Sequence, residues 1–319
     1  MKVLVTGGDG FVGGWLIRAL RAASHQVTAT RRAQARGPVA SVLSDGEAAA
    51  IPWLPLELTD AASVHQLAKV SVDAVIHLAA VSSVGESCRD PERCWEVNSL
   101  GTVRLLEALS RSAEQAGVEP PKVILASTGE VYGPGDSVPR SELSPVRPVS
   151  PYAASKLAAE WAVAEAGRRV GFEYLIARPF SHTGPGQSAG FVAPAFARRI
   201  LEARRLGMSE ISVGNLGVVR DLLDVRDVVR AYLALLEFGV SGQIYNIARG
   251  EGIQIGDLLT GLLEAAEYEA TPVIDPALAR KVDIPHLVGD ATKLKVAAGW
   301  SPQLSLNQTL KDLLDAQAD

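Results

Sequence analysis

The sequence predicts an α/β fold, with a doubly wound parallel sheet and a smaller α/β C-terminal region. Short β-branched runs alternate with longer helical patterns over residues 1–178, which is the rhythm of parallel β-α-β units. A glycine-rich segment at 7–13 directly follows the first run and precedes an amphipathic helix. This order is typical of a Rossmann-type, dinucleotide-binding domain. We therefore expect that domain at 1–178, with a returning segment near 211–248, and a mainly substrate-binding region at 179–319.

Apolar runs along the chain are expected to form the strands of this sheet. They lie at residues 3–6, 25–30, 73–78, 122–127 and 174–177. The last three are continuous enough to be buried on both faces of a parallel sheet. Beyond residue 180 a loop rich in glycine and proline, a helix and isolated strands replace this rhythm. That change marks the expected start of the C-terminal region.

Composition excludes several classes of protein. Hydrophobic residues make up 47% of the 319, which is ample for a core, and a net charge of −5 argues against nucleic-acid binding. No apolar run suits a membrane span or a signal peptide, so we expect a cytoplasmic protein without a membrane partner. Cys88 and Cys94 lack the spacing of a zinc site. We interpret them as reduced, non-catalytic thiols and expect no metal.

The glycine segment indicates where a cofactor pyrophosphate would bind. Glycines permit a tight turn and a close approach of the backbone, and the N–H groups that begin the next helix attract phosphate. Arg31 and Arg32 follow the second strand, where an NAD-selective site would carry Asp or Glu. Guanidinium groups suit a 2′-phosphate, so NADP(H) is favoured, with NAD(H) as the alternative. Both arginines could instead be solvated residues of a surface loop.

A catalytic pair is predicted at the start of a helix. Ser150 suits the N-cap and Pro151 the first helical position. Tyr152 and Lys156 then lie in the opening turns, four residues apart on one face. We expect the ammonium and the positive helix end to lower the pKa of the phenol from about 10, which would make it a useful acid–base group.

Thr128 is the predicted hydroxyl partner of this pair. It follows the strand at 122–127, at the carboxyl edge where open α/β sheets bind ligands. It can therefore hydrogen-bond a reacting oxygen. Without the tyrosine and lysine, a simple polar cap on the strand end would be the better interpretation.

With these motifs in this order and spacing, the chain resembles extended short-chain dehydrogenases/reductases that act on nucleotide sugars, the NAD-dependent epimerase/dehydratase family. The segments at 77–80 and 220–227 extend the likeness, which covers the chain essentially end to end. Residues 178–187, 282–290 and 299–302 are most similar to GDP-4-keto-6-deoxy-D-mannose reductases, which make GDP-D-rhamnose. The resemblance implies reduction of the C4 ketone of a GDP-4-keto-6-deoxyhexose with NAD(P)H.

The resemblance also implies roles for individual residues. Tyr152 would be the proton donor, Lys156 the ribose-binding lysine and Thr128 the catalytic Ser/Thr. The other cofactor-binding residues would be Gly7, Gly10, Phe11, Val12, Arg31, Arg32, Glu57, Leu58, Leu78, Ala79, Ala80, Ala126, Pro179 and His182. A nucleoside-diphosphate sugar would be held by Ser82, Thr128, Ser181, Arg220 and Arg280. A surface ion pair is the alternative for either of the last two arginines.

Departures from the family pattern bear on the reaction. Ser181 stands where Asn is usual, and Leu278 where arginine is common. A 4,6-dehydratase needs an acid and a base, and such relatives commonly carry Asp-Glu or Ser-Glu after the threonine. Gly129 here leaves Glu130 as the one catalytic proton-transfer residue of that pair, which favours reduction while Glu130 keeps dehydration open.

Two further alternatives stay open at this point. Residues 85–87 resemble UDP-galactose 4-epimerases, whereas Arg31 argues against an epimerase that retains NAD. A non-enzymatic dinucleotide sensor is disfavoured, because such proteins typically lose the tyrosine and lysine. We also expect a homodimer, as in relatives that pack two helices per subunit into a four-helix bundle. Leu157, Trp161 and Val163 could contribute to that interface, or could equally belong to the core.

Overall fold

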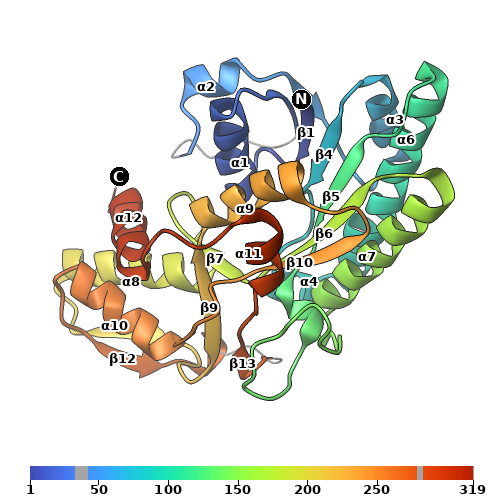
Figure 1. The fold of residues 1–319 in the computed structure, drawn as a ribbon. Coiled ribbons are helices and arrows are strands. Elements are labelled where there is room, and N and C mark those ends of the chain that lie inside the picture. The colour runs from blue at the N-terminus through green and yellow to red at the C-terminus, as the bar shows by residue number, and fades with distance from the viewer. Residues whose placement is uncertain (33–41, 279–282, 319) are drawn as a thin grey trace.

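The computed structural model describes residues 1–32, 42–278 and 283–318 (Figure 1). Its centre is a seven-stranded sheet in the order β10-β6-β5-β4-β1-β2-β3, in which every neighbouring pair is parallel. The predicted α/β fold with a doubly wound parallel sheet is confirmed. The strands are β1 Lys2–Thr6, β2 Gln26–Arg31, β3 Trp53–Pro55, β4 Ala74–His77, β5 Lys122–Ala126, β6 Tyr174–Pro179 and β10 Gln243–Ile247.

The five predicted strands agree with the structure to within one or two residues. Strands β3 and β10 were missed as individual strands, although β10 lies within the returning segment expected near 211–248. β3 has only three residues and ends in Pro55, so no apolar run in the sequence predicts it. It pairs with β2 alone, at the edge of the sheet, where a residue without an N–H is tolerated. Its register places Arg31 opposite Pro55.

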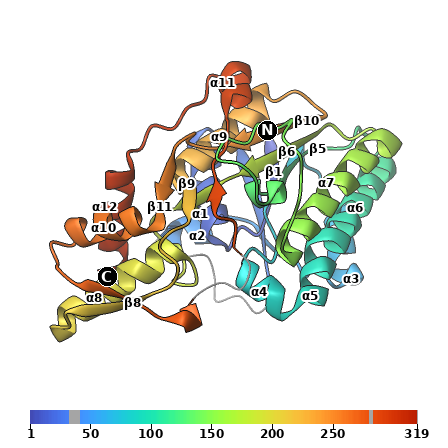
Figure 2. The ribbon, with the colours of Figure 1, turned by 90° about the horizontal axis from the view of Figure 1, so that it is seen from below.

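Helices cover both faces of this sheet (Figure 2). One face carries α1 (Phe11–Ala22) and α9 (Val225–Phe238), which pack on each other and on a core that includes Val5 and Ile76. The other carries α6 (Gly101–Ala116) and α7 (Pro151–Val170) over a second core. Shorter segments complete these layers: α2 Asp45–Ala49, α3 Ala61–His65, η1 Gln66–Lys69, α4 Val84–Arg89, α5 Pro91–Trp95 and η2 Glu96–Leu100.

Most of the C-terminal elements gather beside the sheet, at the lower left of Figure 1, whereas α11 packs on α9 and β10 near the centre. They enclose a third hydrophobic core between α8, α10 and α12. Strand β9 pairs with β7, β11 and β13, and β8 pairs with β12. The elements are β7 Ser181–Thr183, α8 Val192–Leu206, β8 Glu210–Val213, β9 Val219–Asp224, β11 Gly252–Gln254, α10 Ile255–Ala265, β12 Thr271–Ile274, η4 Pro276–Leu278, β13 His286–Leu287, α11 Thr292–Ala298 and α12 Leu306–Ala318.

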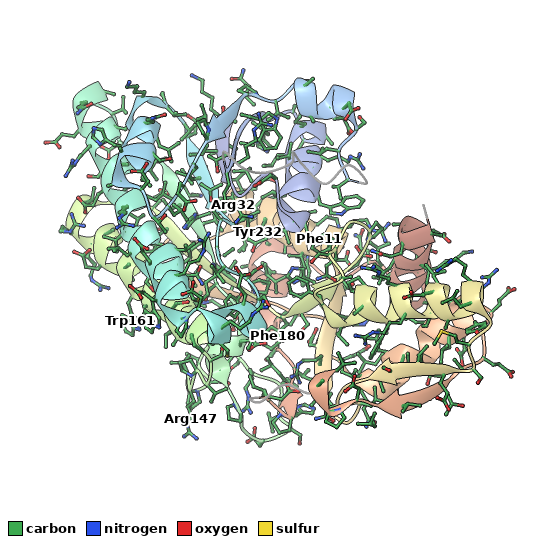
Figure 3. All side chains as sticks on the ribbon, turned by 180° about the vertical axis from the view of Figure 1, so that it is seen from behind. Phe11, Arg32, Arg147, Trp161, Phe180 and Tyr232 are labelled. Atoms are coloured by element: carbon green, nitrogen blue, oxygen red, sulfur yellow. The ribbon has the colours of Figure 1, made fainter. Side chains whose placement is uncertain are left out.

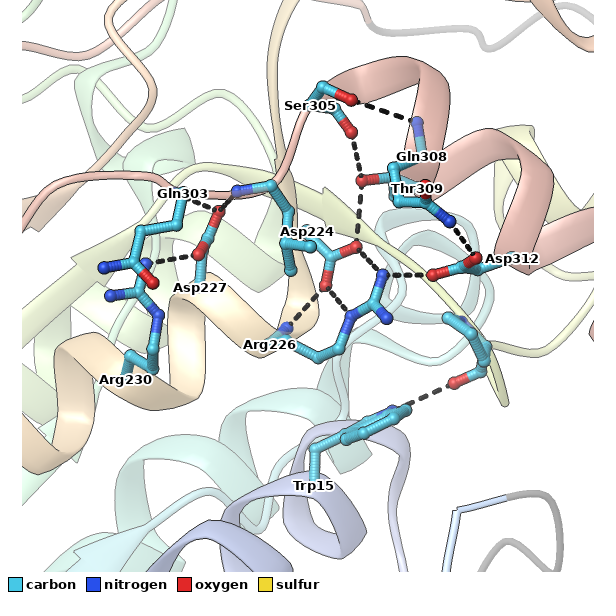
Figure 4. A network of polar contacts seen from close by, with 12 residues as sticks. Trp15, Asp224, Arg226, Asp227, Arg230, Gln303, Ser305, Gln308, Thr309 and Asp312 are labelled. Carbon is cyan, nitrogen blue, oxygen red and sulfur yellow. Dashed lines mark hydrogen bonds and ion pairs between the residues drawn. The ribbon is translucent and has the colours of Figure 1, made fainter.

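A polar network fastens the last helix to the start of α9 (Figure 4). The Asp224 carboxylate caps α9 by accepting from the backbone N–H and the guanidinium of Arg226. It also accepts from the Thr309 hydroxyl at 2.8 Å, and Arg226 reaches Asp312 at 2.7 Å. Both partners lie on α12, so these bonds hold that helix against the end of β9.

The exposed residues of α7 bear on the expected dimer. Trp161 is 65% exposed, whereas Val163 is fully buried in the core and cannot belong to a surface. Figure 3 shows Trp161 at the periphery of the molecule.

In the described part of the chain, no helix has the length and apolar character needed to cross a membrane.

Candidate active site

A cavity of about 910 Å³ lies along the carboxyl edge of the seven-stranded sheet, between that edge and the C-terminal elements. Its wall is formed by the glycine segment, the ends of β2, β4, β5 and β6, and residues of β7, α8 and β9. Every predicted site residue that the structure describes lines it, from Gly7 and Arg32 at the first strands to Tyr152 and Arg220. Arg280 lies outside the described residues.

The glycine segment packs so closely against its own turn and the end of β4 that two of its positions have no room for a side chain. Gly7 has a φ of +69°, and an added Cβ would lie 2.9 Å from the Cα of Ala79. A Cβ on Gly13 would lie 2.2 Å from the Gly7 carbonyl oxygen. Gly10 is the N-cap of α1, so the first N–H groups of that helix face the cavity edge. This cradle fits a pyrophosphate and therefore a dinucleotide.

Arginine side chains stand at the β2 end of the cavity. Arg31 ends β2, and its guanidinium lies 5.7 Å from the centre of the Trp53 ring. Arg32 is also exposed to the cavity. The sequence reasoning missed Asp9 here: burial raises the pKa of its carboxyl, and the charges of Arg32 and Arg31 oppose that shift. The two cations thus lie close enough to Asp9 for their charges to act on its half-buried carboxyl.

The predicted catalytic pair lies at the start of α7, as expected. Ser150 caps this helix by accepting from the Ala153 N–H at 3.1 Å, and Pro151 is its first residue. Lys156 is 4% exposed and donates to the Ala126 carbonyl oxygen at 2.6 Å. Burial lowers the pKa of Lys156 to about 8.

The expected effect on Tyr152 was wrong. Burial raises the pKa of its phenol, a hydrogen bond with Thr128 lowers it, and the negative charge of Glu130 raises it again. Desolvation of a phenolate is costly, and the buried ammonium nearby donates to Ala126. The phenol is therefore protonated at neutral pH.

A buried network supports this end of the cavity from behind. Glu160, one turn after Lys156, accepts from the Ser127 hydroxyl and from Arg178 Nε and Nη2 at 2.9 and 2.6 Å. Arg178 also donates to the Tyr132 hydroxyl at 3.1 Å. Sequence reasoning missed these residues, although Glu160 is four residues after Lys156 on the same helix face. The network fixes the ends of β5 and β6 beside Thr128.

Glycine at position 129 is constrained by an aromatic ring. A Cβ on Gly129 would lie 3.0 Å from three atoms of the Phe180 ring, which packs over this turn. The turn itself, η3 (Gly129–Tyr132), begins with Thr128 accepting from the Glu130 N–H at 3.2 Å. A larger side chain at 129 would require the ring to move.

The predicted diphosphate-binding arginine is held by carbonyl oxygens and by an acid. Arg220 Nη1 donates to the carbonyl oxygens of Ile284 and Val219 at 2.6 and 2.8 Å, and Nη2 pairs with Asp283. Asp283 also lines the cavity and was missed. Ser82, Ser181 and His182 line the same cavity, and His182 Nδ1 lies 2.9 Å from the Phe180 carbonyl oxygen. Among the described residues, no group of three His, Cys, Asp or Glu side chains could hold a metal ion.

The chain is similar to known proteins over nearly its whole length. The model of the NAD dependent epimerase/dehydratase family matches residues 3–248. The chain is 35% identical to the GDP-6-deoxy-D-mannose reductase of Pseudomonas aeruginosa, over 98% of this chain and 96% of that protein.

Solved structures of RMD and of a UDP-glucose 4-epimerase are both similar to this chain in fold. The structure of RMD from Pseudomonas aeruginosa complexed with NADPH has a TM-score of 0.83 and 33% identity, covering 99% of this chain and 98% of that one. The UDP-glucose 4-epimerase of Thermotoga maritima with UDP-glucose has a TM-score of 0.87 and 29% identity, covering 99% and 98%.

Proposed function

The chain belongs to the NAD dependent epimerase/dehydratase family, whose members act on nucleotide sugars with NAD(P), and we propose that it reduces the C4 ketone of a GDP-4-keto-6-deoxyhexose with NADPH. The cofactor supplies the hydride when it is bound. The chain supplies the proton and the orientation of the substrate. Its overall likeness to a GDP-6-deoxy-D-mannose reductase supports this choice of reaction.

The proposed proton donor is Tyr152. Its raised pKa keeps the phenol protonated at neutral pH, which is the form that donates to a carbonyl oxygen. An epimerase would first need the phenolate as a base. Thr128, hydrogen-bonded to the phenol, would orient the substrate oxygen, and Lys156, with a pKa of about 8, keeps most of its charge near pH 7 beside them.

One observation favours reduction of the ketone over dehydration of the sugar. Dehydration needs a second proton-transfer group beside Glu130, and the adjacent position is Gly129, over which the Phe180 ring packs. An acidic side chain at 129 would meet that ring. Glu130 alone beside the threonine supports simple reduction, although it is the residue through which a dehydratase activity would act.

Arg31 and Arg32 support NADPH over NADH as the reductant. Their charges act on the same half-buried carboxyl, that of Asp9, and they stand at the end of β2, where an NAD-selective site would present an acid. Each charge-assisted bond to a 2′-phosphate contributes about 1.5–3 kcal/mol. Arg220, held by Ile284, would bind the substrate diphosphate.

A two-substrate assay on one preparation tests the proposed function. GDP-4-keto-6-deoxymannose with NADPH should be consumed with stoichiometric loss of NADPH, while GDP-mannose alone should give no 4-keto sugar. A 4-keto product from GDP-mannose would identify a 4,6-dehydratase. Interconversion of UDP-hexoses without net cofactor turnover would identify a 4-epimerase, the alternative supported by the epimerase-like structure.

A further inference from the structure

Tyr232 is a buried phenol in the cavity wall to which no role has been given so far. It lies in the middle of α9, is 1% exposed and lines the cavity. Two other tyrosines are as deeply buried. The Tyr132 hydroxyl donates to Asn246 Oδ1 at 2.7 Å, and the Tyr245 hydroxyl accepts from the Val240 N–H at 3.1 Å.

The Tyr232 hydroxyl differs from these two. Within the described residues it has no hydrogen-bond partner, and yet no fully buried side-chain oxygen or nitrogen there lacks one. The small exposed area of Tyr232 must therefore be at its hydroxyl oxygen, which opens onto the cavity. Leaving a buried hydroxyl without a partner is unfavourable, so this group is placed to bond whatever occupies the cavity.

The position of Tyr232 assigns it to one end of the cavity. Helix α9 contacts β5, β6 and β7, on the half of the sheet that carries Thr128, whereas Arg31 and Arg32 lie at the other half. Tyr152 is near enough for its phenolate to add to the effect of burial in raising the pKa of Tyr232. Figure 3 shows Tyr232 in the interior of the molecule, in contrast to Trp161 and Arg147 at the periphery.

Two helices on opposite faces of the sheet thus bring phenols to the same carboxyl edge. Tyr152 comes from α7 and Tyr232 from α9. A nicotinamide dinucleotide that has its adenine end at Arg31 must reach this edge for its reactive ring to lie near Tyr152.

We propose that Tyr232 is a cofactor-binding residue whose hydroxyl hydrogen-bonds the nicotinamide half of the dinucleotide. This inference rests on the proposed function only in requiring a nicotinamide dinucleotide in the cavity. The ring of Tyr232 closes the α9 side of that end, and its hydroxyl is the polar group that α9 contributes there in the described structure.

Equilibrium binding to Tyr232→Phe tests the proposal, with fluorescence titration of NADPH and calorimetry of 2′,5′-ADP, which has the adenine half alone. One lost hydrogen bond should weaken NADPH about two- to tenfold and leave 2′,5′-ADP unchanged. Tyr245→Phe is the matched control, because Tyr245 is equally buried but does not line the cavity. It should change neither affinity, while thermal unfolding should show lower stability because the Val240 N–H loses its acceptor.

Each other outcome has a definite meaning. Unchanged NADPH affinity in Tyr232→Phe, or equal weakening of NADPH and 2′,5′-ADP, would overturn the role of Tyr232 and leave the proposed function standing. Wild-type protein that binds neither NADPH nor NADH would overturn both. If NADH binds more tightly than NADPH, the same comparison is made between NADH and ADP, with the same expected ratio.

Discussion

Replacing Glu160 by Gln should strongly destabilise the protein. Glu160 and Arg178 are each only 4% exposed, and the carboxylate accepts two bonds from the guanidinium and one from Ser127. Glutamine keeps the shape but presents an NH2 group to one guanidinium nitrogen. Arg178 would then keep its charge without a counter-ion, next to the Tyr132 hydroxyl.

The expected loss is about 3–5 kcal/mol, the usual cost of removing one partner of a buried ion pair. That is a large share of a total stability of about 5–15 kcal/mol. Urea unfolding followed by circular dichroism at pH 7 measures it. Glu165→Gln is the control, since Glu165 lies on the same helix and pairs with Arg169 at the surface, and its unfolding midpoint should match that of the wild type.

A loss of less than about 1 kcal/mol in the free energy of unfolding of Glu160→Gln would refute the reasoning, because an uncompensated buried charge destabilises a protein by more than that. So would an equal loss in the two variants, which would mean that burial of the pair does not matter. A double variant, Glu160→Met with Arg178→Met, should regain part of the stability, because no charge is then left buried.

Four further outcomes are expected. Tyr152→Phe should keep NADPH affinity while turnover of a 4-keto sugar nucleotide falls about 10²–10⁴-fold, and an unchanged rate would move the proton donor elsewhere. Replacing Arg31 and Arg32 by Ala should weaken NADPH at least about tenfold in titrations and spare NADH; equal affinities in the wild type would contradict this. Burial lowers the pKa of His77 to about 3, so the unfolded chain takes up a proton that the folded chain does not. The contribution of His77 to the free energy of unfolding should then be fully present above about pH 6.5 and be lost as the pH falls towards 3. His77→Gln should therefore flatten the pH dependence of urea unfolding over that range. Trp161→Glu should convert the expected homodimer to a monomer in sedimentation velocity, and a wild-type monomer would remove the basis of the test.

Local signals account for the parts of the fold that the sequence predicts well. Continuous apolar runs mark β4, β5 and β6, because strands buried on both faces admit few polar residues. Ser150 and Pro151 mark the start of α7 by chemistry that acts within four residues. Strand β3 has no such signal, since its place at the edge depends on pairing with β2.

The site residues divide in the same way. The glycine segment and Tyr152 with Lys156 belong to local motifs and can be read from the chain. The pKa of Tyr152 cannot, because the helix end and the lysine act locally whereas burial depends on everything that packs around the phenol. The effect of burial on the pKa is the largest and raises it, so the phenol of the resting site is a proton donor and not a base.

Tyr232 illustrates the largest gap between sequence and site. Within the sequence it is one apolar-facing position of an amphipathic helix, eighty residues after Tyr152, and its neighbours Val228 and Leu235 belong to the core. Only the sheet brings the two phenols to one cavity, because α7 and α9 cover opposite faces and each contributes a tyrosine to the cavity at the carboxyl edge. A phenylalanine would satisfy the helical pattern and the core equally well. The hydroxyl therefore requires an explanation from the cavity into which it opens, and the nicotinamide half of the cofactor is the ligand that we propose for it.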